Sequence, residues 1–293
     1  MMSVDLLQKR IRKFKNPTVV DFTASAEMLP PVLLKKHDTW LEAYDAFCRN
    51  MLCALKDVVP AVRFRFSTFS LYGNPGIIML RSLLLEARER GYYVFLDCVQ
   101  ILPAGEAEQA AEILFDPESI WAFHGLIVST YIGSDGLKPF VRKMKGTDKS
   151  LFGVVRTGNK SCSELQDLLT GNRLSHTAAA DLVNRMGETM IGSSGYQMIG
   201  ALAGASSADS IRTLRSKYSR LFLLLDSIDD PGANFKVCSL AFDKFGHGAA
   251  VCAGEYVISA WRNGRPGGDN YLDMSLDAVA RIKINLNKYI TIL

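Results

Sequence analysis

The chain has 293 residues, of which 48% are hydrophobic, and a net charge of +4 from 34 basic and 30 acidic residues. This hydrophobic content suffices for a sizeable core, and the positive excess is too small to indicate a nucleic-acid partner. No apolar run approaches the roughly 18 residues that a membrane span needs. Residues 1–17 are basic and lack the apolar stretch and cleavage site of a signal peptide, so we expect a cytoplasmic protein without a membrane partner.

The cysteines and histidines are scattered, without the spacing of a disulfide framework or of a metal site. We therefore expect reduced, buried thiols, and neither a metal nor a cofactor. The cysteines and histidines are Cys48, Cys53, Cys98, Cys162, Cys238, Cys252, His37, His124, His176 and His247.

Residues 1–17 are expected to form an N-terminal helical extension, followed by one domain over residues 18–293. Within the extension, residues 4–14 place Leu7 and Ile11 on an apolar face, and basic side chains cover the remainder. A helix of this kind can lie on a membrane surface. We favour a second interpretation, in which it covers the base of a barrel.

From residue 18 onward, short apolar segments alternate with helical patterns. Eight of these segments are rich in β-branched or aromatic residues, as buried strands are. Eight strands alternating with eight helices predict a single-domain α/β fold, the (β/α)8 TIM barrel. The expected strands are 18–22, 61–66, 93–98, 125–129, 151–156, 198–202, 221–225 and 249–253. The expected helices are 38–58, 75–90, 104–115, 134–144, 162–190, 206–217, 233–245 and 274–288, the last with Ser275 as N-cap.

The third expected strand ends near a single acid, Asp97. Because α/β barrels place their chemistry at the carboxyl ends of the strands, Asp97 is a candidate catalytic residue. The alternative, which we favour, is that it pairs with Arg63 across the barrel mouth. Of Arg63 and Arg65 on the second strand, we expect one to face the interior and the other to pack against a helix.

Several motifs, in order along the chain, resemble those of the orotidine 5'-phosphate decarboxylase family in its longer bacterial form. Residues 125–140 resemble the family's fourth strand and loop, residues 154–159 its R-T-S-N motif, and residues 199–201 the beginning of its V-G-A-T motif. The similarity covers about residues 18 to 262. It implies a barrel, a homodimer, and a lyase of pyrimidine biosynthesis that decarboxylates orotidine 5'-phosphate.

The family's catalytic network alternates lysine and aspartate on strands two and three. The resemblance implies that Arg63, Asp97, Val99 and Leu102 occupy these four positions here. Val99 then replaces the lysine that protonates the product carbon, and Leu102 replaces the aspartate that reaches into the partner subunit. A valine cannot donate a proton, so we expect the family's mechanism to lack its proton source.

The resemblance also implies an altered phosphate corner. Residues 226–233 match the family's phosphate loop only poorly, and an acid stands where the family has its phosphate-binding arginine. Exchanging a guanidinium for carboxylates turns the electrostatic interaction with a bound phosphate from attraction into repulsion. This is enough to abolish ordinary phosphate affinity. The acids are Asp226, Asp229, Asp230 and Glu255. They could hold a divalent cation or an amine; we favour a solvated acidic loop.

The resemblance leaves three ligand-binding positions in place, namely Asp21, Thr157 and Asn159, whereas Gly158 replaces a serine that contacts the pyrimidine. Three hypotheses follow. The first is a paralogue that binds a ligand or partner without catalysis, as a homodimer or as a heterodimer with an active homologue. The second is an active decarboxylase with a relocated lysine, for which Lys160 is the candidate. The third is an enzyme of new specificity that uses Asp97 and the acidic corner.

Overall fold

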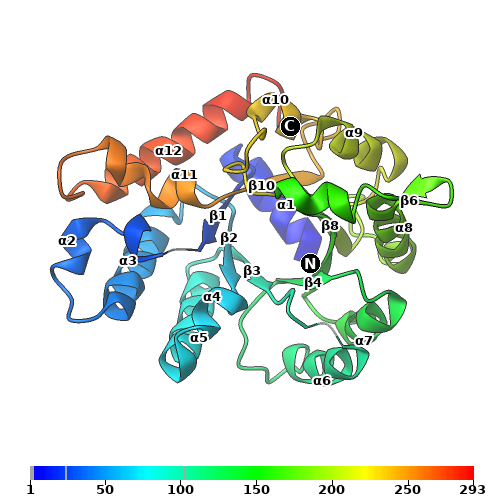
Figure 1. Ribbon diagram of the computed structural model, residues 1–293, viewed down its shortest axis with the longest axis horizontal. Helices are drawn as coiled ribbons and strands as arrows, with labels where there is room; N and C mark the ends of the chain where they lie inside the picture. The colour runs from blue at the N-terminus through cyan, green and yellow to red at the C-terminus, as the bar shows by residue number, and fades with distance from the viewer. Residues whose placement is uncertain (1–2, 24, 102) are drawn as a thin grey trace.

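The computed structural model describes residues 3–23, 25–101 and 103–293, so Leu102 lies outside the described residues. Within these ranges eight parallel strands close into a barrel, in the order β1-β10-β9-β8-β5-β4-β3-β2 (Figure 1). This confirms the (β/α)8 fold. The strands are β1 (Thr18–Phe22), β2 (Ala61–Arg65), β3 (Tyr93–Asp97), β4 (Gly125–Ser129), β5 (Ser150–Arg156), β8 (Ile199–Gly204), β9 (Leu223–Asp226) and β10 (Ala249–Ala253).

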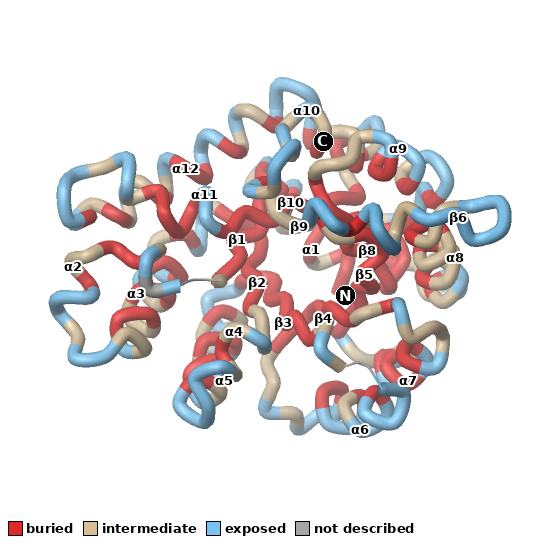
Figure 2. Tube along the Cα trace, in the orientation of Figure 1, coloured by how far each residue is buried: buried red, intermediate tan, exposed pale blue. Residues whose placement is uncertain are grey.

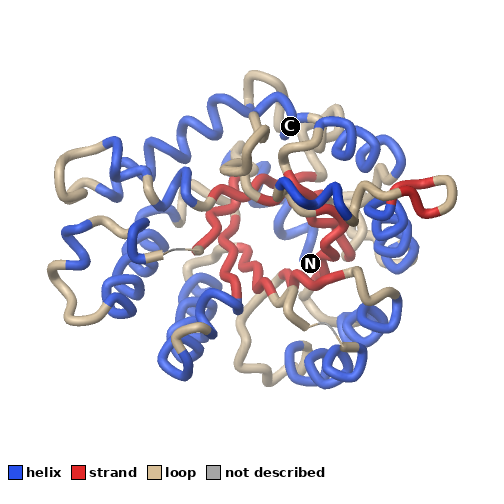
Figure 3. Tube along the Cα trace, viewed as in Figure 1, coloured by secondary structure: helices blue, strands red, loops and turns tan. Residues whose placement is uncertain are grey.

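Helices surround the ring of strands (Figure 3). Over the described ranges, no helix is both long and apolar enough to cross a membrane. The helices are α1 (Ser3–Phe14), α2 (Pro31–Leu34), α3 (Trp40–Leu55), α4 (Phe66–Ser70), α5 (Gly73–Glu89), α6 (Ala104–Leu114), α7 (Ser134–Met144), α8 (Ser175–Gly187), α9 (Ala208–Lys217), α10 (Phe235–Ser239), α11 (Glu255–Ile258) and α12 (Tyr271–Leu286). The 3-10 turns are η1 (Ala26–Met28), η2 (Lys160–Glu164) and η3 (Ala260–Asn263).

The expected helix over residues 162–190 is wrong in its first half. The chain forms η2 and then a short antiparallel hairpin of β6 (Leu169–Thr170) and β7 (Arg173–Leu174) before α8 begins. Gly171 adopts a φ of 66°, and Gly171-Asn172 is the kind of two-residue turn that favours a hairpin over a helix. The hairpin projects outward from the barrel (Figure 1).

Two further expectations are corrected near the C-terminus. The helix expected over 233–245 shortens to α10, and the chain continues in turns, as the bond from the N–H of Leu240 to the carbonyl of Val237 shows. The Asp243 carboxylate then accepts hydrogen bonds from the backbone N–H groups of Phe245 and His247, which excludes a helix at the end of the expected range. Ser275 is not the N-cap of α12, which begins at Tyr271. Instead, Ser275 Oγ donates to the carbonyl of Val257 at 3.0 Å and ties α12 to α11.

Aromatic rings fill the barrel interior, which is buried along its strands (Figure 2). Phe152 packs edge-on against Phe95 and Phe222, with ring centroids 5.1 and 6.2 Å away. Glycines make room for these rings, since a Cβ at Gly125 would meet Phe95 and a Cβ at Gly200 would meet Phe152. The barrel is therefore a packed core whose free space is confined to its ends.

Helix α1 contacts the amino ends of several strands and lies behind the ring in the view of Figure 1. Ser3 Oγ donates to the hydroxyl of Tyr93, the first residue of β3, and Gln8 Oε1 accepts from the N–H of Gly248, which precedes β10. The Asp5 carboxylate accepts from the N–H groups of Ser194 and Ser193, at 2.8 and 3.0 Å. The helix thus covers the base of the barrel.

Asp5 provides a test of this contact. Burial alone would raise the pKa of Asp5, but the hydrogen bonds from Ser194 and Ser193 outweigh it and hold the pKa below its ordinary value. The ionised carboxylate therefore contributes stability above the unfolded-state pKa of about 3.9, and this contribution is lost as pH falls through the lower folded-state pKa. At pH 7 we expect Asp5→Asn to lower the free energy of unfolding by about 1–3 kcal/mol.

Urea unfolding from pH 7 down to pH 3 measures the difference in the free energy of unfolding between Asp5→Asn and the parent chain. This difference should narrow below about pH 4. Asp209→Asn, at a side chain that is 95% exposed, is the control and should change little. A difference between Asp5→Asn and the parent chain that stays constant across this range would contradict the assignment.

Candidate functional site

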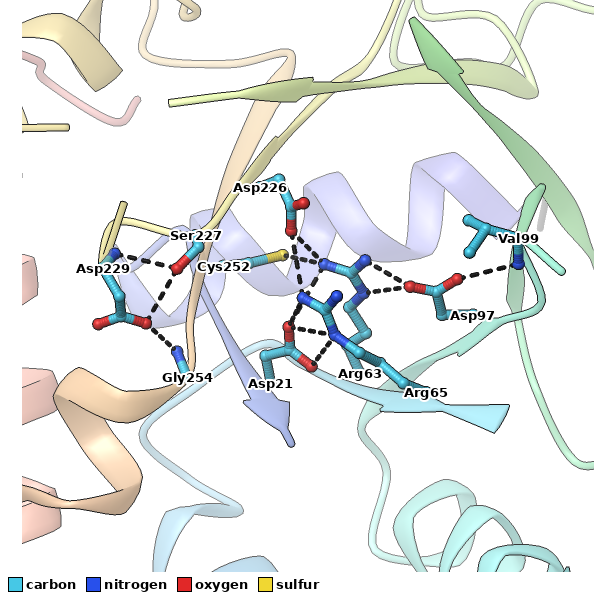
Figure 4. Close-up of polar contacts among 10 residues, drawn as sticks. All are labelled: Asp21, Arg63, Arg65, Asp97, Val99, Asp226, Ser227, Asp229, Cys252 and Gly254. Carbon is cyan, nitrogen blue, oxygen red and sulfur yellow. Dashed lines mark hydrogen bonds and ion pairs between the residues drawn. The ribbon is translucent and has the colours of Figure 1, made fainter. Parts of the chain in front are cut away.

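The guanidinium of Arg63 lies at the centre of the carboxyl end of the barrel, with its side chain only 2% exposed (Figure 4). Its Nε and Nη2 donate to Oδ2 of Asp97 at 3.1 and 2.5 Å. Its Nη1 donates to Oδ1 of Asp226 at 2.6 Å and to Oδ2 of Asp21 at 3.4 Å. Strands β1, β2, β3 and β9 thus converge on one buried charge, and Asp97 pairs with Arg63 as we favoured.

Arg65 belongs to the same network, so the expectation that one of the two arginines packs against a helix was wrong. Residues two apart on a strand project from the same face, and Arg65 follows Arg63 toward the mouth. Its Nη2 donates to Oδ2 of Asp21 at 2.6 Å and to Oδ1 of Asp226 at 3.4 Å. Asp21, one of the expected ligand-binding residues, is therefore held by arginines.

The network shifts the pKa values of Arg63 and Asp226. Burial would lower the pKa of Arg63, but the carboxylates of Asp226, Asp21 and Asp97 outweigh it and raise the pKa well above its ordinary value. Burial would likewise raise the pKa of Asp226, but Arg63 and Arg65 hold it below its usual range. By formal charge, three carboxylates face two guanidiniums in this network, so one negative charge is in excess.

A cavity of about 250 Å³ lies beside this network. Its lining includes Val99, whose N–H donates to Oδ1 of Asp97 at 3.2 Å, and the side chains of Arg63 and Arg65. Both oxygens of Asp97 are therefore bonded within the protein. Among the described residues, those that line this cavity include no lysine, and Lys160 is exposed at the start of η2.

Thr157 lines the cavity, but its hydrogen-bonding groups are engaged. Its N–H donates to Oε1 of Gln166 at 2.7 Å, and its Oγ1 donates to Oδ1 of Asn159 at 2.6 Å. Asn159 itself is exposed. Thr157 and Asn159, both expected to bind a ligand, are thus bonded to each other, and Gln166 also bonds to Thr157.

The four acids of the expected phosphate corner do not converge on one point. Asp226 pairs with the arginines, and the exposed carboxylate of Glu255 pairs with Arg262 at 3.1 Å. The Asp229 carboxylate accepts from the backbone N–H groups of Gly254 and Tyr256, at 2.9 and 2.8 Å. In the part of the chain that the structure describes, no three acidic, histidine or cysteine side chains form a group that could hold a metal ion.

Asp230, the remaining acid, packs against Gly158. A Cβ at Gly158 would collide with the Asp230 carboxylate, so the loop after β9 leans directly on the loop after β5. Burial and the neighbouring carboxylates of Asp226 and Asp229 raise the pKa of Asp230 above its ordinary value, although Arg65 opposes this shift. While the Asp230 side chain holds this position, only glycine fits at position 158.

Three residues that contribute to the site, Arg65, Gln166 and Tyr131, were not predicted. Arg65 could have been predicted, because residues two apart on a strand lie on the same face as each other. Gln166 and Tyr131 line the cavity from a loop and from the end of the β4 segment, and no spacing in the sequence identifies either of them. The contact of Asp229 with the N–H groups of Gly254 and Tyr256 joins segments 25 residues apart, which sequence patterns do not predict.

The chain is similar over most of its length to curated proteins named orotidine 5'-phosphate decarboxylase, which confirms the resemblance. The relative from Rhodopirellula baltica is 27% identical over 263 residues, which cover 87% of each chain. The relative from Petrotoga mobilis is 24% identical over 280 residues, 95% of this chain and 96% of the relative. No protein-family model matches the chain.

Solved structures show the same fold. A candidate orotidine 5'-phosphate decarboxylase from Streptomyces avermitilis superposes with a TM-score of 0.80 at 19% identity, covering 99% of this chain and 96% of that one. The orotidine 5'-monophosphate decarboxylase of Plasmodium berghei gives a TM-score of 0.74 at 13% identity, covering 97% and 99%. At these identities the likeness concerns the barrel.

Replacing Arg63 tests whether the network depends on it. Arg63→Met leaves Asp97 and Asp226 without their central partner, and uncompensated buried charges of this kind destabilise by about 3–5 kcal/mol. We expect urea denaturation to show a loss of this size. Arg212→Met is the control, because the Arg212–Asp209 ion pair is exposed and such pairs contribute only about 0–1 kcal/mol. Equal losses in the two variants would contradict a central role for Arg63.

Proposed function

We propose that this orotidine 5'-phosphate decarboxylase-like barrel has lost decarboxylase activity and serves as a binding or regulatory paralogue. The observation that carries the proposal is the closed network around Arg63. Each of its three acids bonds to a guanidinium, and Asp97 has both carboxylate oxygens engaged. Catalytic acids and bases need a free atom facing the substrate, and Asp97 does not offer one.

A missing proton donor supports the same conclusion. Decarboxylation leaves a carbanion that must be protonated, and the lysine that does this in the family corresponds, by the resemblance, to Val99. Arg63 cannot substitute, because a guanidinium remains protonated at any pH that a protein tolerates. Its raised pKa makes proton transfer still less favourable.

The phosphate corner supports it as well. In α/β barrels the loops after the last two strands and a short helix often hold a phosphate. Here the N–H groups of Gly254 and Tyr256, at the start of α11, already bond to the Asp229 carboxylate. A phosphate would have to displace this anion and would then meet the neighbouring charge of Asp230.

Each of the other two hypotheses requires a rearrangement of the site. An active decarboxylase would need Lys160 to turn into the site from its exposed position. An enzyme of new specificity would need Asp97 to leave Arg63. We also propose that the protein is cytoplasmic, because all six cysteines are free and five are buried, as is usual in a reducing compartment.

We further propose that the chain self-associates through the surface beside the cavity. Leucines of the segment between β5 and α8 are exposed there, at 71% for Leu165, 53% for Leu168 and 75% for Leu169. Tyr131, which lines the cavity, is 46% exposed. Neighbouring exposed apolar side chains of this kind are typical of protein interaction sites.

An activity assay tests the loss of decarboxylation. The chain, purified from a host that lacks its own decarboxylase, should convert orotidine 5'-phosphate no faster than buffer, as followed by ultraviolet absorbance. Turnover that Lys160→Ala abolishes would establish the relocated lysine. Turnover that survives Lys160→Ala and is lost in Asp97→Asn would assign catalysis to Asp97, and either result would overturn the proposal.

Light scattering tests self-association. We expect a dimer for the parent chain, and a monomer for Leu165→Glu combined with Leu169→Glu, because two carboxylates would be desolvated in the interface. Ile113→Glu, at a residue 61% exposed on α6, is the control and should remain dimeric. A monomeric parent chain would exclude the homodimer and favour the heterodimer with an active homologue.

A further inference from the structure

We propose a second ligand site, for the phosphate group of a small metabolite, in a cleft on the outer side of α11. The cleft lies between α11, η3 and α12 and has a volume of about 390 Å³, within the range of small-molecule sites. Its polar lining residues are Glu255, Tyr256, Ser259, Arg262, Asn263 and Arg281. None of them lines the barrel cavity, so this site is separate from the one discussed above.

Ser259 supplies an unsatisfied donor. The residue is only 6% exposed, and its Oγ is buried without a hydrogen-bond partner among the described residues. An unpaired buried hydroxyl is unfavourable, so the site gains free energy when an acceptor reaches it. A small shift of this side chain toward the cleft would allow a bound oxygen to accept that hydrogen bond.

Two arginines supply positive charge. Arg262 is held in place, because it donates to Glu255 Oε1 at 3.1 Å and to the Glu27 carbonyl at 2.8 Å while its guanidinium lies over the Trp261 ring. Arg281 is exposed and forms no ion pair with any residue that the structure describes. With Glu255 as the one acid of the lining, the cleft carries one positive charge in excess.

These donors favour a phosphate group over a carboxylate. The cleft offers donors from two guanidiniums, the Ser259 hydroxyl and the Asn263 amide. A carboxylate presents only two oxygens, in one plane, whereas a phosphate monoester presents three terminal oxygens. Arginine also binds phosphate in a bidentate manner. The barrel mouth has the opposite balance, with carboxylates in excess.

The frame of the cleft is rigid before a ligand binds. Ser275 Oγ donates a hydrogen bond to the Val257 carbonyl at 3.0 Å, and the N–H of Arg262 donates to the Ser259 carbonyl at 3.1 Å. A backbone frame that is already held in place needs little ordering on association, which favours binding. The proposal does not depend on whether the barrel mouth has catalytic activity.

The test is a titration of the full chain, at constant ionic strength, with inorganic phosphate and with glycerol 3-phosphate, followed by calorimetry. We expect saturable binding of both with a Kd in the millimolar range or below. Arg281→Gln should weaken it at least tenfold, and Ser259→Ala several-fold without loss of stability, since the lost hydroxyl has no protein partner. Arg265→Gln, which removes a nearby arginine outside the cleft, is the control and should leave Kd unchanged.

Three results would overturn the proposal. One is the absence of saturable binding up to about 10 mM, which corresponds to a binding free energy weaker than about 3 kcal/mol. Another is an equal loss of binding in Arg281→Gln and Arg265→Gln, because this would indicate attraction by general surface charge. The third is binding that Arg281→Gln leaves intact, which would locate the anion elsewhere on the molecule.

Discussion

A single buried guanidinium organises the functional end of this barrel. Removing a charge from water costs several kcal/mol, and Arg63 recovers this only because carboxylates from three other strands reach it. That requirement fixes the side chains of Asp21, Asp97 and Asp226, which would otherwise be available to a ligand. The resulting cage stabilises the mouth and engages each of its acids in a hydrogen bond to a guanidinium.

The fold was predictable because its determinants are local. Eight short apolar segments with regular spacing specify eight buried strands, and the observed strands agree with them to within one or two residues at most boundaries. The errors arose where local signals compete, as at Gly171-Asn172, where turn chemistry interrupts an otherwise helical pattern. The site was harder to predict, because contacts such as that of Asp229 with the N–H of Gly254 depend on tertiary approach.

Helix α11 separates two environments of opposite charge. On its inner side, Asp229 of the loop after β9 bonds to the N–H groups of Gly254 and Tyr256, and Asp226 at the end of β9 pairs with Arg63. On its outer side, Arg262 and Arg281 face a cleft with only one acid. The positive excess therefore lies on the flank of the barrel, and the negative excess lies at its centre.

The packing of Asp230 against Gly158 couples two loops at the mouth of the barrel. A Cβ at position 158 would overlap the Asp230 carboxylate where it now lies, so a larger residue there requires the Asp230 side chain to turn away. The loop after β9 would then present its charge to a different part of the mouth. We therefore expect substitutions at these two positions to have non-additive effects.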